Sequence, residues 1–313
     1  MKRSDFVQQQ HSVCEFSSSD SWVILSPIEQ SIKRKIEAIG TPLKDWDIQI
    51  NYGIKTGYND AFIITTEKRN EILANCKNED ERRRTDELIR PILRGRDIKR
   101  YGYDWANLWL IFIPWHFPYQ FDESIQGASM KAERAFMEQY PAVYSHMLQY
   151  KEPLSKRNKA ETGIRYEWYA MQRWGAKYWE DFYKPKIMYP NMTKYIPFYF
   201  DEKGFYQNDK SFMITGTNVA FLTAFLNSSL FKFCFINNFP ELQGGTRELR
   251  KIFFDKIPVL KVSDDINKRF IPILEDIQNE YTKQKAQIID SMLFDLYKLT
   301  DEERSTIGFV EII

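Results

Sequence analysis

The chain has 313 residues, of which 43% are hydrophobic and 16% aromatic, enough for one large folded domain or two ordinary ones. Its formal net charge is only +1, from 44 Lys and Arg residues against 43 Asp and Glu residues. This balance excludes binding to nucleic acid through a uniformly basic surface, so any such site must be local. Cys14, Cys76 and Cys234 lie far apart without metal-ligand spacing, which predicts no metal site and a reducing, cytoplasmic compartment. No apolar run is long enough to cross a bilayer, so no membrane partner is expected.

The first 20 residues are polar and rich in Gln and Ser, and we expect residues 1–20 to form a flexible leader. The first firm element follows at residues 26–40. Ser26 and Glu29 form a capping-box pattern, with Pro27 in the first helical turn, and Gly40 can end the helix.

The next block, INYGIKTGYNDAFII (Ile50–Ile64), is typical of a strand, a tight turn and a second, buried strand. The turn would present Lys55, Thr56 and Asn59. Its glycines superficially resemble those of a phosphate loop, but the pattern Gly-Lys-Ser/Thr before a helix is missing. A plain hairpin turn with glycines for backbone reasons is the alternative, and even there the exposed Lys could touch a DNA phosphate.

A short helix and a charged link, Lys77–Asp86, precede the segment Leu88–Tyr101, LIRPILRGRDIKRY. Pro91 and Gly95 exclude one smooth helix and predict a bent surface element. Arginine offers a planar fork of donors that fits a phosphate or a guanine edge, so these cations could grip nucleic acid. On charge pattern alone, the favoured interpretation is a solvated face that pairs with upstream acids. The cations of the segment are Arg90, Arg94, Arg96, Lys99 and Arg100.

In the middle of the chain, the residue pattern predicts a buried strand at Leu108–Pro114 and a helix at Met130–Tyr150 that is broken near Pro141. The segment Lys151–Lys186 then interleaves aromatic and cationic residues. Such interleaving suits a nucleic-acid groove, and it equally suits an aromatic-rich core.

Strands are predicted at Lys186–Tyr189 and Ile196–Phe200, followed by an apolar helical stretch at Thr217–Asn238. The stretch PELQGGTRELRK then places two glycines before Arg247 and Arg250. A DNA-contacting loop and a linker with solvated arginines are both open interpretations of that pattern.

One long amphipathic helix is predicted over Ser263–Leu299, and Thr300 with Glu303 can cap a last short helix. These patterns divide the chain into the leader, a domain at residues 21–262 and a helical tail at residues 263–313 that packs on the domain or on a catalytic partner.

Four blocks in this order carry a resemblance: GIKTGYNDAF, LRGRDIKRY, KPKIMYPNM (Lys184–Met192) and FLTAFLNSSL (Phe221–Leu230). From about Trp22 to the C-terminus the chain resembles the TaqI-like C-terminal specificity domain of type II restriction-modification enzymes. The resemblance implies a mixed α/β (α+β) target-recognition domain built on a twisted mixed sheet with flanking helices. It also implies that the chain recognises a DNA sequence for an adenine-specific methyltransferase, and often a nuclease, joined in cis or in trans.

The residues that we predict to contact DNA come from the first two of these blocks and from the stretch PELQGGTRELRK. They are Arg94, Arg96, Lys99, Arg100, Lys55, Thr56, Asn59, Arg247 and Arg250. The alternative is a protein-interaction subunit that docks a partner methyltransferase and leaves DNA contact to that partner.

Catalytic motifs are missing from the sequence. Neither the glycine-rich loop for S-adenosylmethionine nor the Asn-Pro-Pro-Tyr type motif of adenine methyltransferases is present. Asp201, Glu202 and Lys203 are adjacent, which is typical of a solvated turn and not of a metal-dependent nuclease. The resemblance therefore implies no cofactor in this chain, and S-adenosylmethionine and Mg²⁺ in the parent enzyme. An independent enzyme would require a bound nucleotide or metal in a carboxylate-lined pocket.

Overall fold

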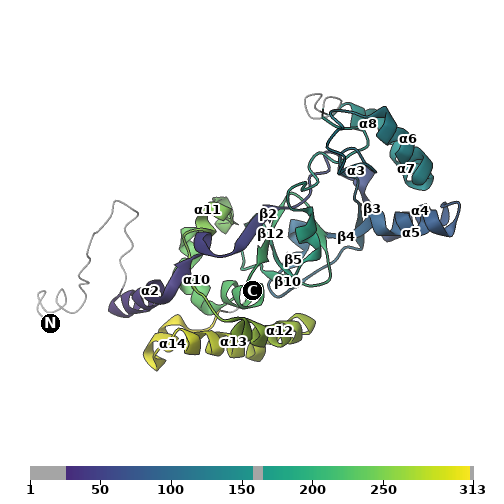
Figure 1. The fold of residues 1–313 in the computed structure, drawn as a ribbon. Coiled ribbons are helices and arrows are strands. Elements are labelled where there is room, and N and C mark those ends of the chain that lie inside the picture. The colour runs from purple at the N-terminus through teal and green to yellow at the C-terminus, as the bar shows by residue number, and fades with distance from the viewer. Residues whose placement is uncertain (1–25, 158–164, 311–313) are drawn as a thin grey trace, which may run out of the picture.

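A computed structural model describes residues 26–157 and 165–310 of the protein. The chain forms two lobes with separate hydrophobic cores, and the described residues are spread along one elongated axis (Figure 1). Helices and open sheets occur in both lobes, which confirms the predicted mixed α/β class. The predicted single sheet is instead two four-stranded sheets, one in each lobe.

The larger lobe is built on an antiparallel sheet in the order β10-β8-β12-β2. Its strands are β2 (Ile48–Tyr52), β8 (Lys186–Pro190), β10 (Tyr199–Asp201) and β12 (Ser211–Gly216). Its helices are α2 (Pro27–Ile39), α9 (Val219–Leu226), α10 (Ser229–Phe235), α11 (Lys251–Phe254), α12 (Asp264–Asn279), α13 (Lys283–Leu296) and α14 (Asp301–Ile307). Every residue of α9 is buried, so this helix forms the centre of the core.

Local signals near both ends of the described chain set the starts of two helices of the larger lobe. Ser26 and Glu29 form the predicted capping box of α2, with Pro27 in its first turn. Thr300 and Glu303 form a second capping box at α14. Both predictions are confirmed because a cap depends on residues only three positions apart.

The smaller lobe is built on a mixed sheet in the order β11-β4-β7-β3, in which β11 runs parallel to β4 and the other pairs are antiparallel. Its strands are β3 (Ile63–Thr65), β4 (Ile89–Leu93), β7 (Leu108–Ile111) and β11 (Tyr206–Gln207). Its helices are α3 (Asn59–Phe62), α4 (Thr66–Ala74), α5 (Glu79–Leu88), α6 (Met130–Gln139), α7 (Pro141–Leu148) and α8 (Lys151–Ser155). The interior position of β7 and the helix break at Pro141 are as predicted.

Strand β12 joins the two lobes through the alternation of its side chains. Successive residues of a strand point to opposite faces of its sheet. Phe212 and Ile214 accordingly pack in the core of the larger lobe, whereas Met213 between them packs in the core of the smaller lobe. The lobes therefore share one strand and not merely a linker.

Short strands connect distant parts of the chain. The pair β1 (Gly40–Pro42) and β14 (Pro258–Leu260) ties α2 to the chain after α11. The pair β9 (Met192–Thr193) and β13 (Arg247–Glu248) and the pair β5 (Ile98–Lys99) and β6 (Gly102–Tyr103) complete the ladders. These pairs place segments that are far apart in sequence beside one another.

Three predicted elements differ from the structure. Residues 77–86 are not a link, because Asn78 caps helix α5 through a hydrogen bond from Glu81 N. Ala61 and Phe62 are buried as predicted, but in the short helix α3 and not in a strand. The predicted long C-terminal helix is two helices, α12 and α13, separated at residues 280–282, and Thr282 caps the second.

The helical tail lies against the larger lobe. Helix α12 packs along α9, and α13 packs on α10. Phe270, Leu274 and Leu293 from the tail are part of the same core as α9. The predicted leader lies outside the described residues.

No single helix in the described ranges has the length and apolar composition needed to cross a bilayer. One bent pair, α9 with the residues 229–238 that follow it, meets these criteria by composition and length alone. That pair is largely buried in the larger lobe.

Candidate nucleic-acid interface

Backbone hydrogen bonds bring the predicted segments to one margin of the molecule, near the ends of β2 and β12. Lys55 N donates to Arg173 O over 3.0 Å, which ties the first block to the aromatic segment. Asn191 N donates to Lys210 O over 2.9 Å, and Leu249 N donates to Asn191 O over 2.8 Å. Gly53 N donates to Ser211 O over 3.0 Å and connects the two groups, so segments that are far apart in sequence form one continuous strip. We call it the basic margin.

Two glycines permit this close approach. A Cβ on Gly53 would lie 2.1 Å from Asn208 O, and a Cβ on Gly95 would lie 2.7 Å from Lys210 O. Any larger residue would push the strands apart there. The glycines of the GIKTG and LRGRD blocks therefore serve the convergence of the chain, and Lys55 and Arg96 lie close to them in sequence.

Lys55 and Arg173 face each other across an isolated antiparallel bridge. Residues directly opposite on such a ladder extend their side chains to the same face, and like charges there are destabilising. Arg173 is exposed and Lys55 is half-buried, and neither side chain has a partner among the described residues. Two cations without side-chain partners among the described residues therefore lie opposite each other.

Arg94 and Arg100, which we predict to contact DNA, are instead used inside the fold. Arg94 donates to both carboxylate oxygens of the buried Asp97, over 2.9 and 2.8 Å, and this hydrogen bonding raises the pKa of Arg94. Arg100 is only 9% exposed and donates to Asn227 O from two of its nitrogens. The prediction for Arg100 required an exposed guanidinium, and the structure contradicts it. The predicted pairing with upstream acids does not occur either, because the partner of Arg94 lies within the segment.

Arg96 and Lys99 are the exposed cations of the same segment. Lys99 Nζ donates to Arg96 O over 3.0 Å and lies 3.6 Å from Asp104, so its position is partly fixed. The Arg96 side chain has no partner in the part of the chain that the structure describes. Both border a groove of about 610 Å³ whose wall includes Tyr195. Arg96 is therefore the free cation that the bent segment presents.

Thr56 and Asn59 divide between fold and surface. Thr56 is 3% exposed and donates to Asn59 Oδ1 over 2.6 Å, which sets up the start of α3. This burial contradicts the prediction that Thr56 is presented at a turn. Asn59 itself is exposed, so its predicted contact remains a prediction.

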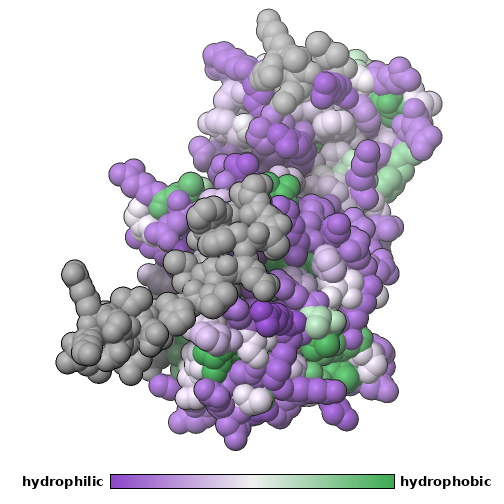
Figure 2. All heavy atoms as spheres, turned by 90° about the vertical axis from the view of Figure 1, so that its left-hand side faces the viewer, coloured by the Kyte–Doolittle hydropathy of each residue, from purple (hydrophilic) through white to green (hydrophobic). Residues whose placement is uncertain are grey.

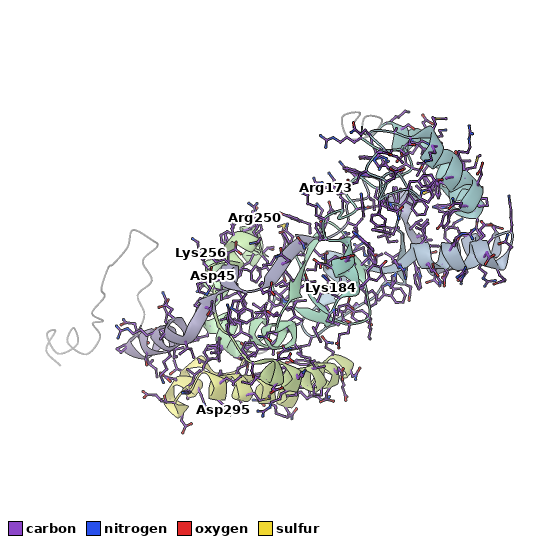
Figure 3. The ribbon with its side chains drawn as sticks, viewed as in Figure 1. Asp45, Arg173, Lys184, Arg250, Lys256 and Asp295 are labelled. Carbon is purple, nitrogen blue, oxygen red and sulfur yellow. The ribbon has the colours of Figure 1, made fainter. Side chains whose placement is uncertain are left out.

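Arg247 and Arg250 flank the predicted glycine loop. Arg247 donates to Phe239 O over 2.7 Å and lies 2.7 Å from Glu241, so it holds the two ends of the loop together. Arg250 is exposed and pairs with Glu248 at 2.8 Å. Figure 3 shows Arg250 and Arg173 along the same upper margin, between α11 and the smaller lobe. Arg250 is therefore on the basic margin, whereas Arg247 is structural.

Two residues of the basic margin, Arg173 and Lys210, were missed as site residues. Arg173 lies in the aromatic and cationic segment, whose interleaving left both interpretations open. The sequence around Lys210 contains no pattern that predicts a site. Lys210 lies on the basic margin because of the turn at Asn208 and the close approach of its carbonyl to Gly95.

Acidic side chains of the described residues do not form a metal centre. Within residues 26–157 and 165–310, no three His, Cys, Asp or Glu side chains lie together as metal ligands. Asp201 is fully buried and accepts from Lys186 Nζ over 2.6 Å, so it is not the solvated turn residue that we predicted. These residues therefore offer no fitting ligand set for Mg²⁺.

The fold is that of a mixed α/β module, and the basic margin lies along one side of it. The family model for the TaqI-like C-terminal specificity domain matches residues 90–259, more than half of the chain. The chain belongs to this family and is a specificity domain of type II restriction-modification enzymes. The match contains the LRGRDIKRY, KPKIMYPNM and FLTAFLNSSL blocks and is narrower than the resemblance that we described, since the block at residues 50–64 precedes it.

Individual proteins are also similar to this chain. The chain is 21% identical over 238 residues to the type II methyltransferase M.MjaIV of Methanocaldococcus jannaschii, covering 73% of this chain and 70% of that protein. It is also similar to the type IIL restriction-modification enzyme MmeI, solved in complex with DNA (TM-score 0.48, 15% identity, 85% of this chain). A second solved structure is the type IIG restriction endonuclease BpuSI (TM-score 0.47, 13% identity, 87% of this chain). The chain spans about a third of each solved enzyme, 33% and 34%.

Proposed function

We propose that this specificity domain binds duplex DNA along the basic margin and positions it for an adenine-specific methyltransferase module, with or without a nuclease. The Lys55–Arg173 pair is the observation that carries the proposal. Like charges opposite each other cost stability in the free domain, and a DNA phosphate would remove that cost.

The distribution of charge supports a local grip. With a net charge of +1, the protein as a whole does not attract a polyanion. The basic margin nevertheless presents Lys55, Arg173, Arg96 and Lys210 without partners among the described residues. Arg250, Lys99 and Asn59 extend the margin, while Arg94 and Arg247 hold its loops in place.

The chemistry would belong to other modules. S-adenosylmethionine and Mg²⁺ are expected in the methyltransferase and nuclease parts of the parent enzyme, in cis or in trans. Under this proposal the specificity domain supplies no reacting group. It fixes the register of the duplex, so that the adenine reaches the methyltransferase.

Fluorescence anisotropy with a random-sequence duplex of about 25 base pairs, between about 50 and 200 mM salt, tests the proposal. Replacing Lys55 and Arg173 together by Ala should weaken binding about tenfold or more at the lowest salt. It should also reduce the salt slope by roughly 2, because two phosphate contacts are lost.

The matched control removes two other exposed cations, Lys33 and Lys268, which pair with acids on α2 and α12. This variant should bind as the wild type does. If the wild-type domain shows no salt-dependent binding, or if both double variants bind equally, the DNA-binding proposal fails. The protein-docking alternative would then be favoured.

A further inference from the structure

We propose that a groove beside β2 receives one extrahelical nucleotide of the bound DNA. The groove has a volume of about 710 Å³ and lies where the polar face of β2 meets the 3-10 helix η3 (Trp179–Tyr183). This volume falls in the range of about 300–1,000 Å³ that is usual for small-ligand sites. The inference rests on the proposed DNA binding, because the groove begins at Arg173 on the basic margin.

Aromatic rings that are already fixed in place form the walls. The Trp115 ring stacks on Tyr166 at 4.7 Å, and its indole N–H donates to Met171 O over 2.8 Å. Trp179 packs against Phe121 at 5.4 Å. Both Trp rings line the groove and remain partly exposed. Because the rings need no rearrangement, a planar base could stack on them at little entropic cost.

Amide side chains form the polar part of the groove. Gln49 and Asn51 are two positions apart on β2, so they extend to the same face of the sheet. Asn51 Nδ2 donates to Asp181 Oδ2 over 3.1 Å, and the side chain of Gln49 has no hydrogen-bond partner within the described residues. An amide offers both a donor and an acceptor, as the edge of a nucleobase requires.

Charge along the groove limits how much of a strand it can take. Three cations, Arg173, Lys177 and Lys184, and two acids, Glu180 and Asp181, line the groove that we assign to the nucleotide, so its lining is net positive. A second groove continues from it through Lys184 and Asp181, and its lining includes Asp47, Glu202 and Asp264. Phosphates are attracted to the first part and repelled by the second. A single nucleotide that enters from the basic margin fits this gradient, whereas a continuous single strand does not.

Only an unstacked base could use these walls, because both faces of a base in a duplex are covered by its neighbours. Leaving the stack costs a few kcal/mol for a paired base, and least for a base that is mismatched or unpaired. The domain should therefore prefer DNA with an unpaired nucleotide over a perfect duplex.

The test compares two probes of the same sequence, a perfect duplex and a duplex with one unpaired 2-aminopurine. The wild-type chain should bind the second probe about tenfold more tightly, since stacking on an aromatic side chain is worth about 1–3 kcal/mol per base. Binding should also quench the 2-aminopurine fluorescence, because the base stacks on an indole ring.

Trp179→Leu should abolish both the preference and the quenching while leaving affinity for the perfect duplex unchanged. Gln49→Leu, an exposed position on β2, should reduce the preference and provides a second variant if Trp179→Leu does not fold. The matched control is Trp109→Leu, because that ring packs under Arg69 in the smaller lobe and does not line the groove. The control should keep the preference.

The outcomes separate the two proposals. If both probes bind equally tightly, the nucleotide site is wrong and the DNA-binding proposal stands. If neither probe binds, both fail. If the control loses the preference as Trp179→Leu does, the preference arises outside the groove and the inference is overturned.

Discussion

The segment Arg94–Arg100 and the Lys55–Arg173 bridge differ in whether their cationic side chains have partners. In the first region two of the cations are held inside the fold, Arg94 by an ion pair with Asp97 and Arg100 by hydrogen bonds to a backbone carbonyl. In the second region two cations are held opposite each other with no acid between them. The cations that are dense in sequence mostly stabilise the domain, and the cations that meet only in space remain available to a ligand.

The difference teaches how to recognise an anion site in this fold. A buried charge must be paired or hydrogen-bonded, because an isolated charge in the interior is costly. Arginines next to a hydrophobic core therefore form ion pairs or hydrogen bonds within the fold. An exposed pair of like charges is kept at a small cost in stability, and that cost is what an anion would remove.

The largest expected effect is a difference in stability between variants of Arg100 and Arg96, two residues of the segment Leu88–Tyr101. Arg100→Ala should lower the free energy of unfolding by about 2–3 kcal/mol, because buried acceptors lose their donor. Arg96→Ala should leave stability within about 0.5 kcal/mol, since the side chain is exposed. Urea denaturation measures both changes.

DNA affinity should show the reverse order for the same two variants. Folded Arg100→Ala should bind the random-sequence duplex as the wild type does, and Arg96→Ala should bind more weakly with a salt slope smaller by about 1. Equal losses of affinity in both variants would show that the two arginines do not differ in role.

A buried, hydrogen-bonded carboxylate of the larger lobe, Glu303, should make the stability of the protein depend on pH. Lys35 and Ser31 of α2 hydrogen-bond to Glu303 of α14 over 2.6 and 2.8 Å. Burial alone would raise the pKa of Glu303, but the hydrogen bonds from Lys35, Thr300 and Ser31 outweigh it and hold the pKa below its usual 4.5. The folded protein therefore binds the proton less well than the unfolded chain does.

The resulting stability is present above about pH 4.5 and is lost as the pH falls through the lower folded pKa. At pH 7, Glu303→Gln should be less stable than the wild type by about 1–2 kcal/mol in urea denaturation. The gap between the two proteins should narrow as the pH falls from 5 towards 3. A gap that stays constant over this range would mean that the carboxylate charge contributes nothing.

The smallest expected effect concerns the Lys55–Arg173 bridge itself. Lys55→Glu replaces repulsion from Arg173 by attraction, so the free energy of unfolding should rise by about 0.2–1 kcal/mol at low salt. The gain should vanish near 1 M salt, where the screening length is about 3 Å. The same variant should bind DNA more weakly than Lys55→Ala. A variant that is less stable than the wild type at low salt would contradict the repulsive pair.

Surface composition bears on the docking alternative. Figure 2 shows one face of the molecule. Among the residues that are coloured by hydropathy, hydrophilic residues predominate and hydrophobic residues lie in small separate groups. Partner interfaces usually have a contiguous apolar centre. That face therefore does not favour the docking alternative.

Much of the secondary structure was predictable because its causes are local. The capping boxes at Ser26 and Thr300, the break at Pro141 and the buried run at Leu108 each depend on a few adjacent residues. Predictions failed where the local pattern fits two states or where a cap was missed. Ala61 and Phe62 are apolar in a strand or a helix, and the break between α12 and α13 precedes the cap at Thr282.

The sequence by itself determined the mixed α/β class, most helix starts, the family and the presence of cations near Gly95 and Gly53. Only the tertiary structure decided which cations are free. Arg100 is buried and hydrogen-bonds to a carbonyl 127 residues away in the sequence. Lys55 lies opposite Arg173 only because a bridge joins two distant segments. Charge compensation acts over a few ångströms in space, and strand register, which the sequence order does not reveal, sets those distances.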